Sequence, residues 1–317
     1  MPAGRSLDIL ALGEAMVEFN QTGEGGGRLY LQGFGGDTSN FAVAAARQGA
    51  AVGYLSALGD DPYGRLLRGM WDVEGVAHDG VATDENAFTA IYFVTHDDRG
   101  HHFHFFRKGS AASRMTPASL DHAQIANAKL LHLSGISLAI SASARETCFA
   151  AIEIARAADI QVSFDTNLRL KLWSLDDARE AMFRAIALSD LCLPSYDDVL
   201  ALTGLADPDT LVDHCHQLGA KQVALKLGAD GALISDGTRR ERIAAHPCRP
   251  VDATGAGDTF GGALAARLVA GDDLFAAARY AAVAAALSTE GYGAVEPIPS
   301  AARVRAALSS NTITETR

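Results

Sequence analysis

The stretch Val251-Asp252-Ala253-Thr254-Gly255-Ala256-Gly257-Asp258-Thr259-Phe260-Gly261-Gly262 places small residues and a carboxylate directly before an apolar pattern of helical spacing. Small residues let the backbone curl, so we expect the N–H groups around Gly255, Ala256 and Gly257 to converge at a helix N-terminus, where anions bind. Asp258 falls in the first helical turn beside that anion. We expect the helix dipole to keep this carboxylate ionised, so that it can accept a proton from an attacking hydroxyl. The alternative interpretation is a glycine-rich turn followed by an ordinary N-terminal aspartate.

Upstream of this stretch, short apolar runs alternate with longer segments of helical spacing. This alternation predicts an α/β fold with a mostly parallel sheet and helices on both of its faces. We expect strands at residues 8–13, 52–58, 129–134, 161–165, 191–194 and 222–227, and helices that include residues 39–48, 61–71, 142–158 and 176–187. Asp61 and Pro62 supply an N-cap and a proline at the first helical position. Residues 309–317 have the composition of a loose polar tail.

Two stretches break the alternation. Residues 89–95 and 101–107 are rich in strand-forming residues and flank the polar turn Asp97-Asp98-Arg99-Gly100, which predicts an antiparallel hairpin. Residues 14–34 are glycine-rich and equally unlike a helix. We interpret both as one small inserted sheet, a lid over the carboxyl ends of the main strands. The lid is assigned residues 14–35 and 87–108, and the α/β domain residues 1–13, 36–86 and 109–310.

The composition excludes several classes of protein. The 317 residues include 38 acidic and 27 basic side chains, and the net charge of −11 argues against a nucleic-acid or anionic-membrane binder. A hydrophobic content of 48% excludes a largely disordered chain. The four cysteines lie far apart without a Cys-x-x-Cys pair, which fits a reducing compartment. The apolar residues 9–12 are too few for a signal peptide, and the apolar residues 276–287 are too few to span a membrane. We therefore expect a cytoplasmic protein.

Two motifs resemble the signatures of the ribokinase-like (PfkB) carbohydrate kinases. Asp252-Ala253-Thr254-Gly255-Ala256-Gly257-Asp258 is similar to the C-terminal signature of that family. The N-terminal signature resembles Gly35-Gly36-Asp37-Thr38-Ser39-Asn40-Phe41-Ala42, followed by Leu58-Gly59-Asp60-Asp61-Pro62-Tyr63-Gly64. The resemblance extends over nearly the whole chain. It implies a ribokinase-like three-layer αβα domain with a small β-sheet lid, and a kinase that uses ATP and Mg²⁺.

Three further segments are similar to one branch of that family, the 2-keto-3-deoxygluconate kinases. They are Phe105-Phe106-Arg107 with Ser110-Ala111-Ala112, then Leu133-Ser134-Gly135-Ile136-Ser137-Leu138-Ala139, and Phe164-Asp165-Thr166-Asn167-Leu168-Arg169 before Leu172-Trp173. The resemblance implies that Arg107 and Arg169 hold the carboxylate and hydroxyls of a sugar acid, and guanidinium groups suit that task because they grip a carboxylate through two bonds. We therefore expect phosphorylation of the terminal hydroxyl of 2-keto-3-deoxygluconate to its 6-phosphate. The alternatives are a fructokinase or ribokinase-type enzyme with a neutral substrate, and a non-catalytic sugar-binding regulator on the same fold.

The resemblance also implies roles for single residues. The N–H groups of Gly255, Ala256 and Gly257 would stabilise the transferred phosphoryl group, and Asp258 would be the catalytic base. Substrate contacts are implied for Gly35, Gly36, Asp37, Asn40, Tyr92, Phe105, Arg107 and Arg169. Nucleotide contacts are implied for Asn167, Ser195, Lys226, Gly228, Gly231, Gly255 and Gly257. A purely structural alternative makes Asp37 an N-cap and the glycines before it a hinge.

The sequence departs from the family pattern at two places. Phe105 stands where the branch often has a tyrosine, which removes one hydrogen bond to the substrate. Ser195-Tyr196-Asp197-Asp198 stands in place of the Asn-x-x-Glu motif that handles metal and phosphate, so no metal ligand is assigned.

The small sheet carries a histidine cluster, His101-His102-Phe103-His104. Strand alternation places His102 and His104 on one face, which we interpret as exposed polar positions, with a zinc site as the alternative. A lid sheet must also protect its open edges. We therefore expect a homodimer or a higher homo-oligomer that assembles through the lid.

Overall fold

The computed structural model of the protein describes residues 7–97 and 100–314. Its centre is a nine-stranded sheet with the order β13-β12-β11-β10-β9-β8-β1-β4-β5. The strands are β1 (Leu7–Leu12), β4 (Val52–Gly59), β5 (Val81–Asp84), β8 (Ala128–Ser134), β9 (Gln161–Asp165), β10 (Leu191–Leu193), β11 (Gln222–Lys226), β12 (Ala232–Ser235) and β13 (Arg240–Ile243). All neighbours from β11 to β5 pair in parallel, whereas β12 and β13 are antiparallel. The predicted parallel sheet is confirmed.

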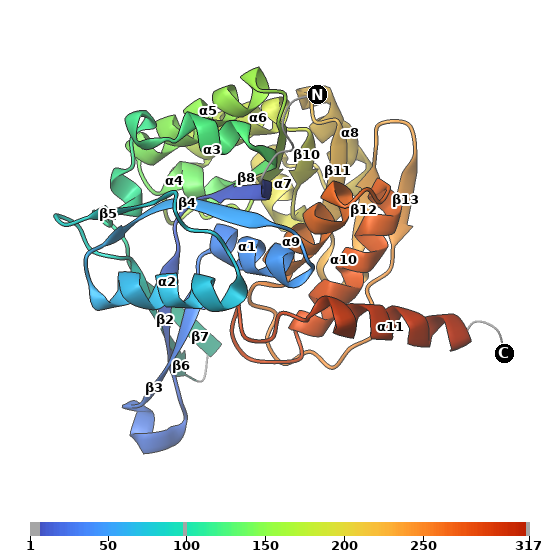
Figure 1. Ribbon diagram of the computed structural model, residues 1–317. Helices are drawn as coiled ribbons and strands as arrows, with labels where there is room; N and C mark the ends of the chain where they lie inside the picture. The colour runs from blue at the N-terminus through green and yellow to red at the C-terminus, as the bar shows by residue number, and fades with distance from the viewer. Residues whose placement is uncertain (1–6, 98–99, 315–317) are drawn as a thin grey trace.

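Helices cover both faces of this sheet (Figure 1). On one face lie α1 (Asp37–Arg47), α2 (Pro62–Glu74), α9 (Ala256–Val269), α10 (Leu274–Ser288) and α11 (Ala301–Thr314). On the other lie α3 (His122–Ala126), α4 (Gly135–Ala139), α5 (Ala142–Ala157), α6 (Leu175–Leu188), α7 (Tyr196–Thr203) and α8 (Pro208–Leu218). Along β1, Ile9 and Ala11 belong to one core and Leu10 and Leu12 to the other. The sequence of a strand that is buried on both faces is therefore a continuous apolar run.

A second sheet of four strands, called here the small sheet, projects from this body in Figure 1. Its order is β3-β2-β6-β7, with β2 (Met16–Gln21), β3 (Tyr30–Gly35), β6 (Ile91–Asp97) and β7 (Gly100–Phe106). The antiparallel β6–β7 register runs from Ile91 opposite Phe106 to Asp97 opposite Gly100, which confirms the predicted hairpin. Its turn residues Asp98 and Arg99 lie outside the described residues.

The boundaries of two helices test local predictions. Pro62 begins α2, and Asp61 Oδ1 accepts a hydrogen bond from Gly64 N–H at 2.8 Å, as the capping pattern predicts. The prediction of a loose tail over residues 309–317 was wrong for residues 309–314, because α11 continues to Thr314, and residues 315–317 lie outside the described residues. Val304 is fully buried and anchors that helix, and the alanines that follow have high helix propensity.

In the part of the chain that the structure describes, no helix is long and apolar enough to cross a membrane.

Candidate active site

The candidate site lies at the carboxyl ends of the central strands, where the small sheet joins the body. Parallel strands bring their carboxyl ends to one edge of a sheet, and open α/β folds bind ligands there. Asp165 ends β9 and Lys226 ends β11, while α1 and α9 begin beside them. Residues that are more than 200 positions apart in the sequence thus meet, as the hydrogen bond between Asn40 and Asp258 demonstrates.

Asp258 is buried in the first turn of α9, where the sequence predicted it. Gly255 is the N-cap with φ +74°, and Asn40 Nδ2 donates to Asp258 Oδ2 at 2.8 Å. Burial, followed by the negative charge of Asp37, raises the pKa of Asp258 to about 7, although the bond from Asn40 opposes the shift. The expectation that the helix dipole holds this carboxylate ionised was therefore wrong, because desolvation and a second carboxylate outweigh the dipole. A pKa near neutrality suits a general base.

The N–H groups at the start of α9 are available to an anion. Ala256 N–H bonds to the carbonyl of Ala253 at 3.2 Å, and Thr259 N–H to that of Gly255 at 2.8 Å. Among the described residues, the N–H groups of Gly257 and Asp258 have no acceptor. Unpaired donors at a helix N-terminus form an anion-binding site.

Asp37 lies opposite Asp258 at the start of α1. The helix begins at Asp37 and its N-cap is Gly36, so the interpretation of Asp37 as an N-cap was wrong. Its Oδ1 accepts from Thr38 N–H at 2.9 Å, and its Oδ2 accepts from Asn167 Nδ2 at 2.8 Å. Asn167, which the sequence assigned to the nucleotide, thus contacts a residue assigned to the substrate. Its φ of +28° is a left-handed conformation that asparagine tolerates better than most residues.

Gly35 and Gly36 are explained by contacts within the protein. A Cβ on Gly35 would lie 2.4 Å from the hydroxyl of Tyr92, and one on Gly36 would lie 2.3 Å from the carbonyl of Glu14. Gly36 also has a φ of +100°, which other residues rarely adopt. The space that a side chain would need at both positions is already filled by the chain itself.

Lys226 lies beneath the first turn of α9. A Cβ on Gly257 would be 3.4 Å from its Nζ, and that Nζ donates to Oδ2 of Asp165. The 3-10 turn at Gly228–Asp230 and then Gly231 follow directly and lead into β12. The ammonium group therefore lies at the edge of the same anion-binding turn.

The two predicted substrate arginines lie in different environments. Arg107, just after β7, is buried and its Nη2 lies 2.5 Å from Oε2 of Glu14, while Ser110 donates to the other oxygen of Glu14 at 2.6 Å. Nε of Arg107 makes no hydrogen bond with the described residues. Burial raises the pKa of Glu14, against the influence of Arg107. Arg169 is exposed and donates to the carbonyl of Leu168 at 2.8 Å.

A cavity of about 660 Å³ separates the small sheet from residues 251–254. Glu18 of β2 lines it, and Tyr92 donates to Oε2 of Glu18 at 2.5 Å. Burial raises the pKa of both groups. Phe105 is 45% exposed, and its ring centroid lies 5.4 Å from that of Tyr92. Glu14 and Glu18 were not predicted from the sequence, although alternation along the first strand of the small sheet could have placed Glu18 on the face of Tyr92.

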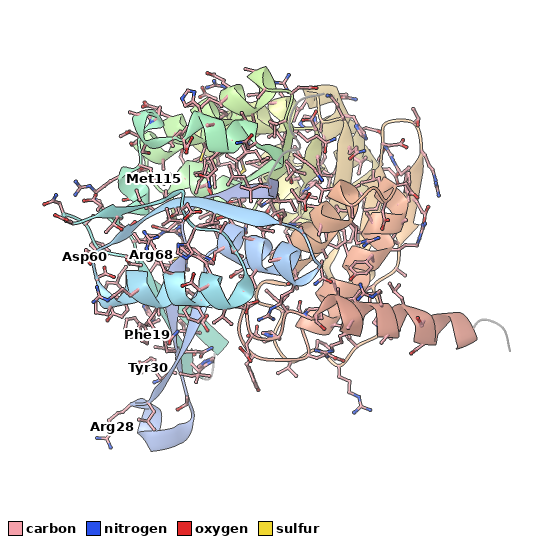
Figure 2. All side chains as sticks on the ribbon, viewed as in Figure 1. Phe19, Arg28, Tyr30, Asp60, Arg68 and Met115 are labelled. Carbon is pink, nitrogen blue, oxygen red and sulfur yellow. The ribbon has the colours of Figure 1, made fainter. Side chains whose placement is uncertain are left out.

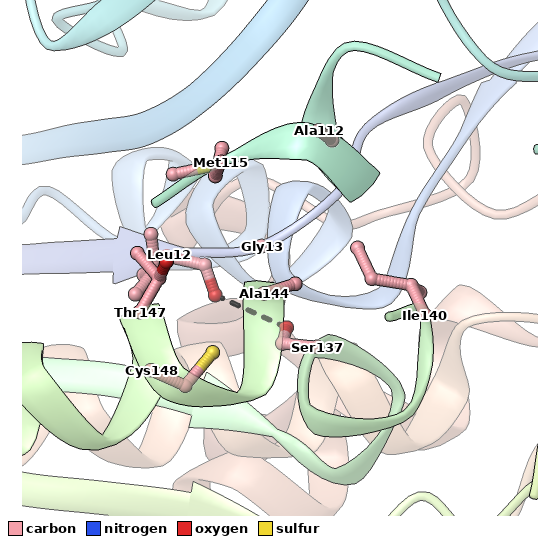
Figure 3. Close-up of a pocket in the computed structure, with 9 residues that line it drawn as sticks. All are labelled: Leu12, Gly13, Ala112, Met115, Ser137, Ile140, Ala144, Thr147 and Cys148. Carbon is pink, nitrogen blue, oxygen red and sulfur yellow. Dashed lines mark hydrogen bonds between the residues drawn. The ribbon is translucent and has the colours of Figure 1, made fainter. Parts of the chain in front are cut away.

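A second, smaller cavity lies behind the end of β1 (Figure 3). Its volume is about 10 Å³, and its lining is apolar apart from groups such as Ser137, which donates to the carbonyl of Leu12 at 3.2 Å. A space of this size holds about one water molecule at most. It is therefore a packing defect and no substrate site.

Ser195 and Asp198 lie beside the end of β9. Thr166 Oγ1 donates to Asp198 Oδ2 at 2.9 Å and accepts from Ser195 N–H at 3.2 Å. The described residues contain no cluster of three histidine, cysteine or acidic side chains that could hold a metal. Isolated carboxylates of this kind fit Mg²⁺, which keeps several waters and binds through few carboxylates and the substrate phosphates.

The histidines of β7 make contacts within the small sheet. Nε2 of His102 lies 2.9 Å from Oδ1 of Asp97, and Nε2 of His104 lies 3.1 Å from Oγ1 of Thr95. His102 and His104 are exposed or partly exposed polar positions with local partners. Asp97 is a carboxylate neighbour of His102 that was not predicted from the sequence.

A carboxylate of near-neutral pKa beside an anion-binding helix N-terminus is typical of enzymes that move a phosphoryl group to a hydroxyl. The chain matches the pfkB family carbohydrate kinases over residues 6–301, and it belongs to that family. The ribokinase-like fold expected from the resemblance is confirmed. A structure of a putative ribokinase II from E. coli in complex with ATP and Mg²⁺ is 25% identical and has a TM-score of 0.88, with 96% of this chain and 99% of that chain covered.

Curated relatives divide between two activities at similar identity. A 2-dehydro-3-deoxygluconokinase of Thermoproteus tenax is 33% identical, with 94% of this chain and 93% of the relative covered. A probable fructokinase-4 of Arabidopsis thaliana is 31% identical, with 97% of this chain and 98% of the relative covered. The chain is thus a carbohydrate kinase, and overall identity does not select its acceptor.

Proposed function

We propose that the protein transfers the γ-phosphoryl group of ATP to the terminal hydroxyl of 2-keto-3-deoxygluconate and so forms the 6-phosphate. The main support is Arg107, a buried guanidinium that is paired with Glu14 through Nη2 while its Nε makes no hydrogen bond with the described residues. A buried donor of this kind calls for an acceptor, and a carboxylate is the acceptor that guanidinium groups bind best. Arg169 would approach the same sugar acid from the end of β9. The relative from Thermoproteus tenax supports this acceptor.

The transfer follows from the groups at the start of α9. Asp258 accepts the proton of the attacking hydroxyl, and Asn40 orients the carboxylate. The N–H groups of Gly257 and Asp258, which have no acceptor among the described residues, would together with that of Gly255 stabilise charge on the transferred group. Ala256 N–H, which the sequence also assigned to this role, bonds instead to the carbonyl of Ala253. Mg²⁺, when bound, neutralises charge on the phosphates of ATP. Asp198 would hold it through water.

The nucleotide and the acceptor occupy opposite sides of this turn. Lys226 would contact the phosphates, and Gly228, Gly231 and Ser195 would border the nucleotide. Asn167, which donates to Asp37, would lie between the nucleotide and the acceptor. On the acceptor side lie Asp37, Asn40, Tyr92 and Phe105, with Gly35 and Gly36 beneath them. The small sheet acts as a lid there and excludes water from the transfer.

A neutral acceptor such as fructose is the second candidate. It is favoured by Glu14, whose carboxylate lies against Arg107 and offsets its charge. Glu18 also presents a carboxylate to the cavity. The hydroxyls of a neutral sugar would donate hydrogen bonds to this carboxylate, whereas the carboxylate of a sugar acid has no proton to donate. The fructokinase relatives agree with this alternative.

Phosphorylation of a panel of acceptors tests the proposal. ADP release would be measured with 2-keto-3-deoxygluconate, its galacto epimer, gluconate, fructose and ribose. We expect the highest kcat/KM with 2-keto-3-deoxygluconate, and equal or better turnover of fructose would contradict the sugar-acid assignment. Arg107→Ala should raise the KM for the sugar acid by about 10-fold or more, because a charged pair contributes about 1.5–3 kcal/mol. Arg184→Ala on α6, which removes an exposed arginine, is the matched control.

We also propose that two copies associate through the small sheet. Its outer strands β3 and β7 leave two open edges, and Phe106 on β7 is 56% exposed. Open edges and exposed aromatic side chains favour pairing with a second chain.

A further inference from the structure

We propose that Asp165 is a positioning residue of the transfer site, which holds the ammonium group of Lys226 beneath the first turn of α9. The proposal rests on the role of Asp258 as the base. It goes beyond that role because it assigns a function to Asp165, which neither the motif nor the choice of acceptor requires.

The geometry of three adjacent strands creates this pair. β10 lies between β9 and β11, and Leu193 pairs with Asp165 across one side of it. On the other side, Lys226 N–H donates to the carbonyl of Pro194 at 2.8 Å. The side chains of Asp165 and Lys226 meet over the end of β10, because the backbone fixes both Cα positions at the same edge of the sheet.

The pair is buried next to the anion-binding turn. The side chain of Asp165 is 6% exposed and that of Lys226 is 13% exposed. A lysine with so little access to water needs a negative partner to remain in place. Asp165 provides that partner. The backbone of Gly257 lies close by, because a Cβ added to it would be 3.4 Å from Nζ of Lys226. The ammonium group is thereby held where a phosphoryl group would bind.

The two members of the pair act on Asp258 with opposite signs. The titratable groups that face Asp258 are Asp37 from α1, Asp165 from β9, Lys226 from β11 and Tyr92 from β6. The charge of Asp165 raises the pKa of Asp258, and that of Lys226 lowers it. Loss of either partner should therefore shift the titration of Asp258 in a direction that is known in advance.

A carboxyl titration of the nucleotide-free protein tests the pair directly. Aspartate carboxyl carbons would be labelled with ¹³C, and the Asp258→Asn variant would identify the signal of Asp258. We expect Asp258 to titrate at higher pH in Lys226→Met and at lower pH in Asp165→Asn, in each case by about half a pH unit or more. The double variant should titrate close to the unmodified protein, because the two removed charges oppose each other.

Steady-state kinetics provide the functional readout. Both single variants should lower kcat by about 10- to 100-fold. The fall of kcat/KM on the acid side should move to higher pH in Lys226→Met and to lower pH in Asp165→Asn, as in the titration. Lys221→Met is the matched control, because Lys221 and Asp190 form an ion pair of 2.6 Å at the opposite edge of the sheet, just before β11 and β10 begin. That variant should leave both the titration and the kinetics unchanged.

The outcomes separate this proposal from the choice of acceptor. If Asp258 titrates as before in both single variants, or shifts in the same direction in both, Asp165 and Lys226 do not act as we propose. If Asp165→Asn does not fold, Lys226→Met and Lys226→Gln still decide the matter. Failure to phosphorylate any sugar acid would contradict the proposed substrate, while the titration would still decide the role of the pair.

Discussion

At the scale of single residues, the site concentrates carboxylates around one reacting position. Asp37, Asp165 and Asp258 lie within electrostatic reach of each other, and Lys226 is the cation among them. Burial of several like charges is unfavourable, so one of them takes up a proton more readily. Asp258 is that group in this structure, since burial and Asp37 raise its pKa to about 7.

This arrangement predicts a pH dependence for the enzyme. Below pH 7, Asp258 would be protonated in the free enzyme and unable to accept the proton of the acceptor hydroxyl. We therefore expect kcat/KM to fall as the pH decreases through about 7, in a single step that corresponds to the protonation of Asp258. A profile measured from pH 5 to 9 in buffers of constant ionic strength checks this. A flat profile across neutrality would contradict the assignment of Asp258 as the base.

Removal of the carboxylate provides the complementary test. Asp258→Asn should reduce kcat by about 10²- to 10⁴-fold, the contribution of a positioned base. The affinity for ATP should be nearly unchanged, because the N–H groups and Lys226 remain. Calorimetric titration of ATP separates this result from a loss of folding. A variant with near-native turnover would refute the role.

How far the sequence predicts the site depends on how local each contact is. The turn around Gly255 and the place of Asp258 in the first helical turn follow from adjacent residues. The pairs Lys226 with Asp165 and Arg107 with Glu14 could not be predicted, because each joins side chains that are far apart in the sequence. The raised pKa of Asp258 was not predicted for the same reason, since it depends on burial in the folded site and on Asp37 from a distant helix.

At the scale of elements, the close packing of α1 and α9 connects the two signature motifs. A Cβ on Gly262 would lie 2.4 Å from the carbonyl of Phe41 and 2.8 Å from Cβ of Ala44. The glycine therefore lets the two helices approach, and this approach brings Asn40 of α1 into contact with Asp258 of α9. The second half of the motif, Gly261-Gly262, thus serves packing and not anion binding.

This packing predicts the effect of one added methyl group. Gly262→Ala should separate the helices, lower the free energy of unfolding by about 1–3 kcal/mol and weaken the bond between Asn40 and Asp258. Urea denaturation and kcat measure the two effects. Gly69→Ala in α2 is the control, because a Cβ there has no atom within 4 Å. It should stabilise the protein by about 0.5–1 kcal/mol, as alanine does in an exposed helix.

The strands of the main sheet that the sequence did not predict are short. β5, β12 and β13 have four residues each, and β12 and β13 form an antiparallel edge on a parallel sheet. Four residues carry too little periodicity to identify a strand. The six longer or more apolar strands were predicted because burial on both faces makes them continuous apolar runs.

At the scale of the whole molecule, the net charge of −11 contrasts with two negative ligands, ATP and the proposed sugar acid. Binding cannot depend on the overall field, which repels both. We propose that it depends on a few local donors, namely the start of α9, Lys226 and the two arginines, together with Mg²⁺. These donors would lie where the small sheet joins the body, so that sheet would border the region that attracts both ligands.

The outer face of the small sheet carries an aromatic cluster that a single copy leaves partly exposed. The rings of Phe19 and Phe93 stack with centroids 5.1 Å apart, and Tyr30 and Phe106 contact Phe93 at their edges. Figure 2 shows Phe19 and Tyr30 along the small sheet, between α2 and the tip that carries Arg28. Tyr30 is 38% exposed and Phe106 is 56% exposed, so a second copy of the sheet would remove apolar surface from water.

Association through this face predicts that a charge on it separates the copies. The unmodified protein should sediment as a dimer or a higher oligomer at micromolar concentration, and Phe106→Glu should sediment as a monomer, because burial of an unpaired carboxylate in an interface is unfavourable. Val73→Glu is the matched control, since Val73 is an apolar residue of α2 that is 84% exposed and lies outside the small sheet. An unmodified protein that sediments as a monomer would contradict the proposal. So would a Phe106→Glu variant of unchanged mass, because the contact would then lie elsewhere on the molecule.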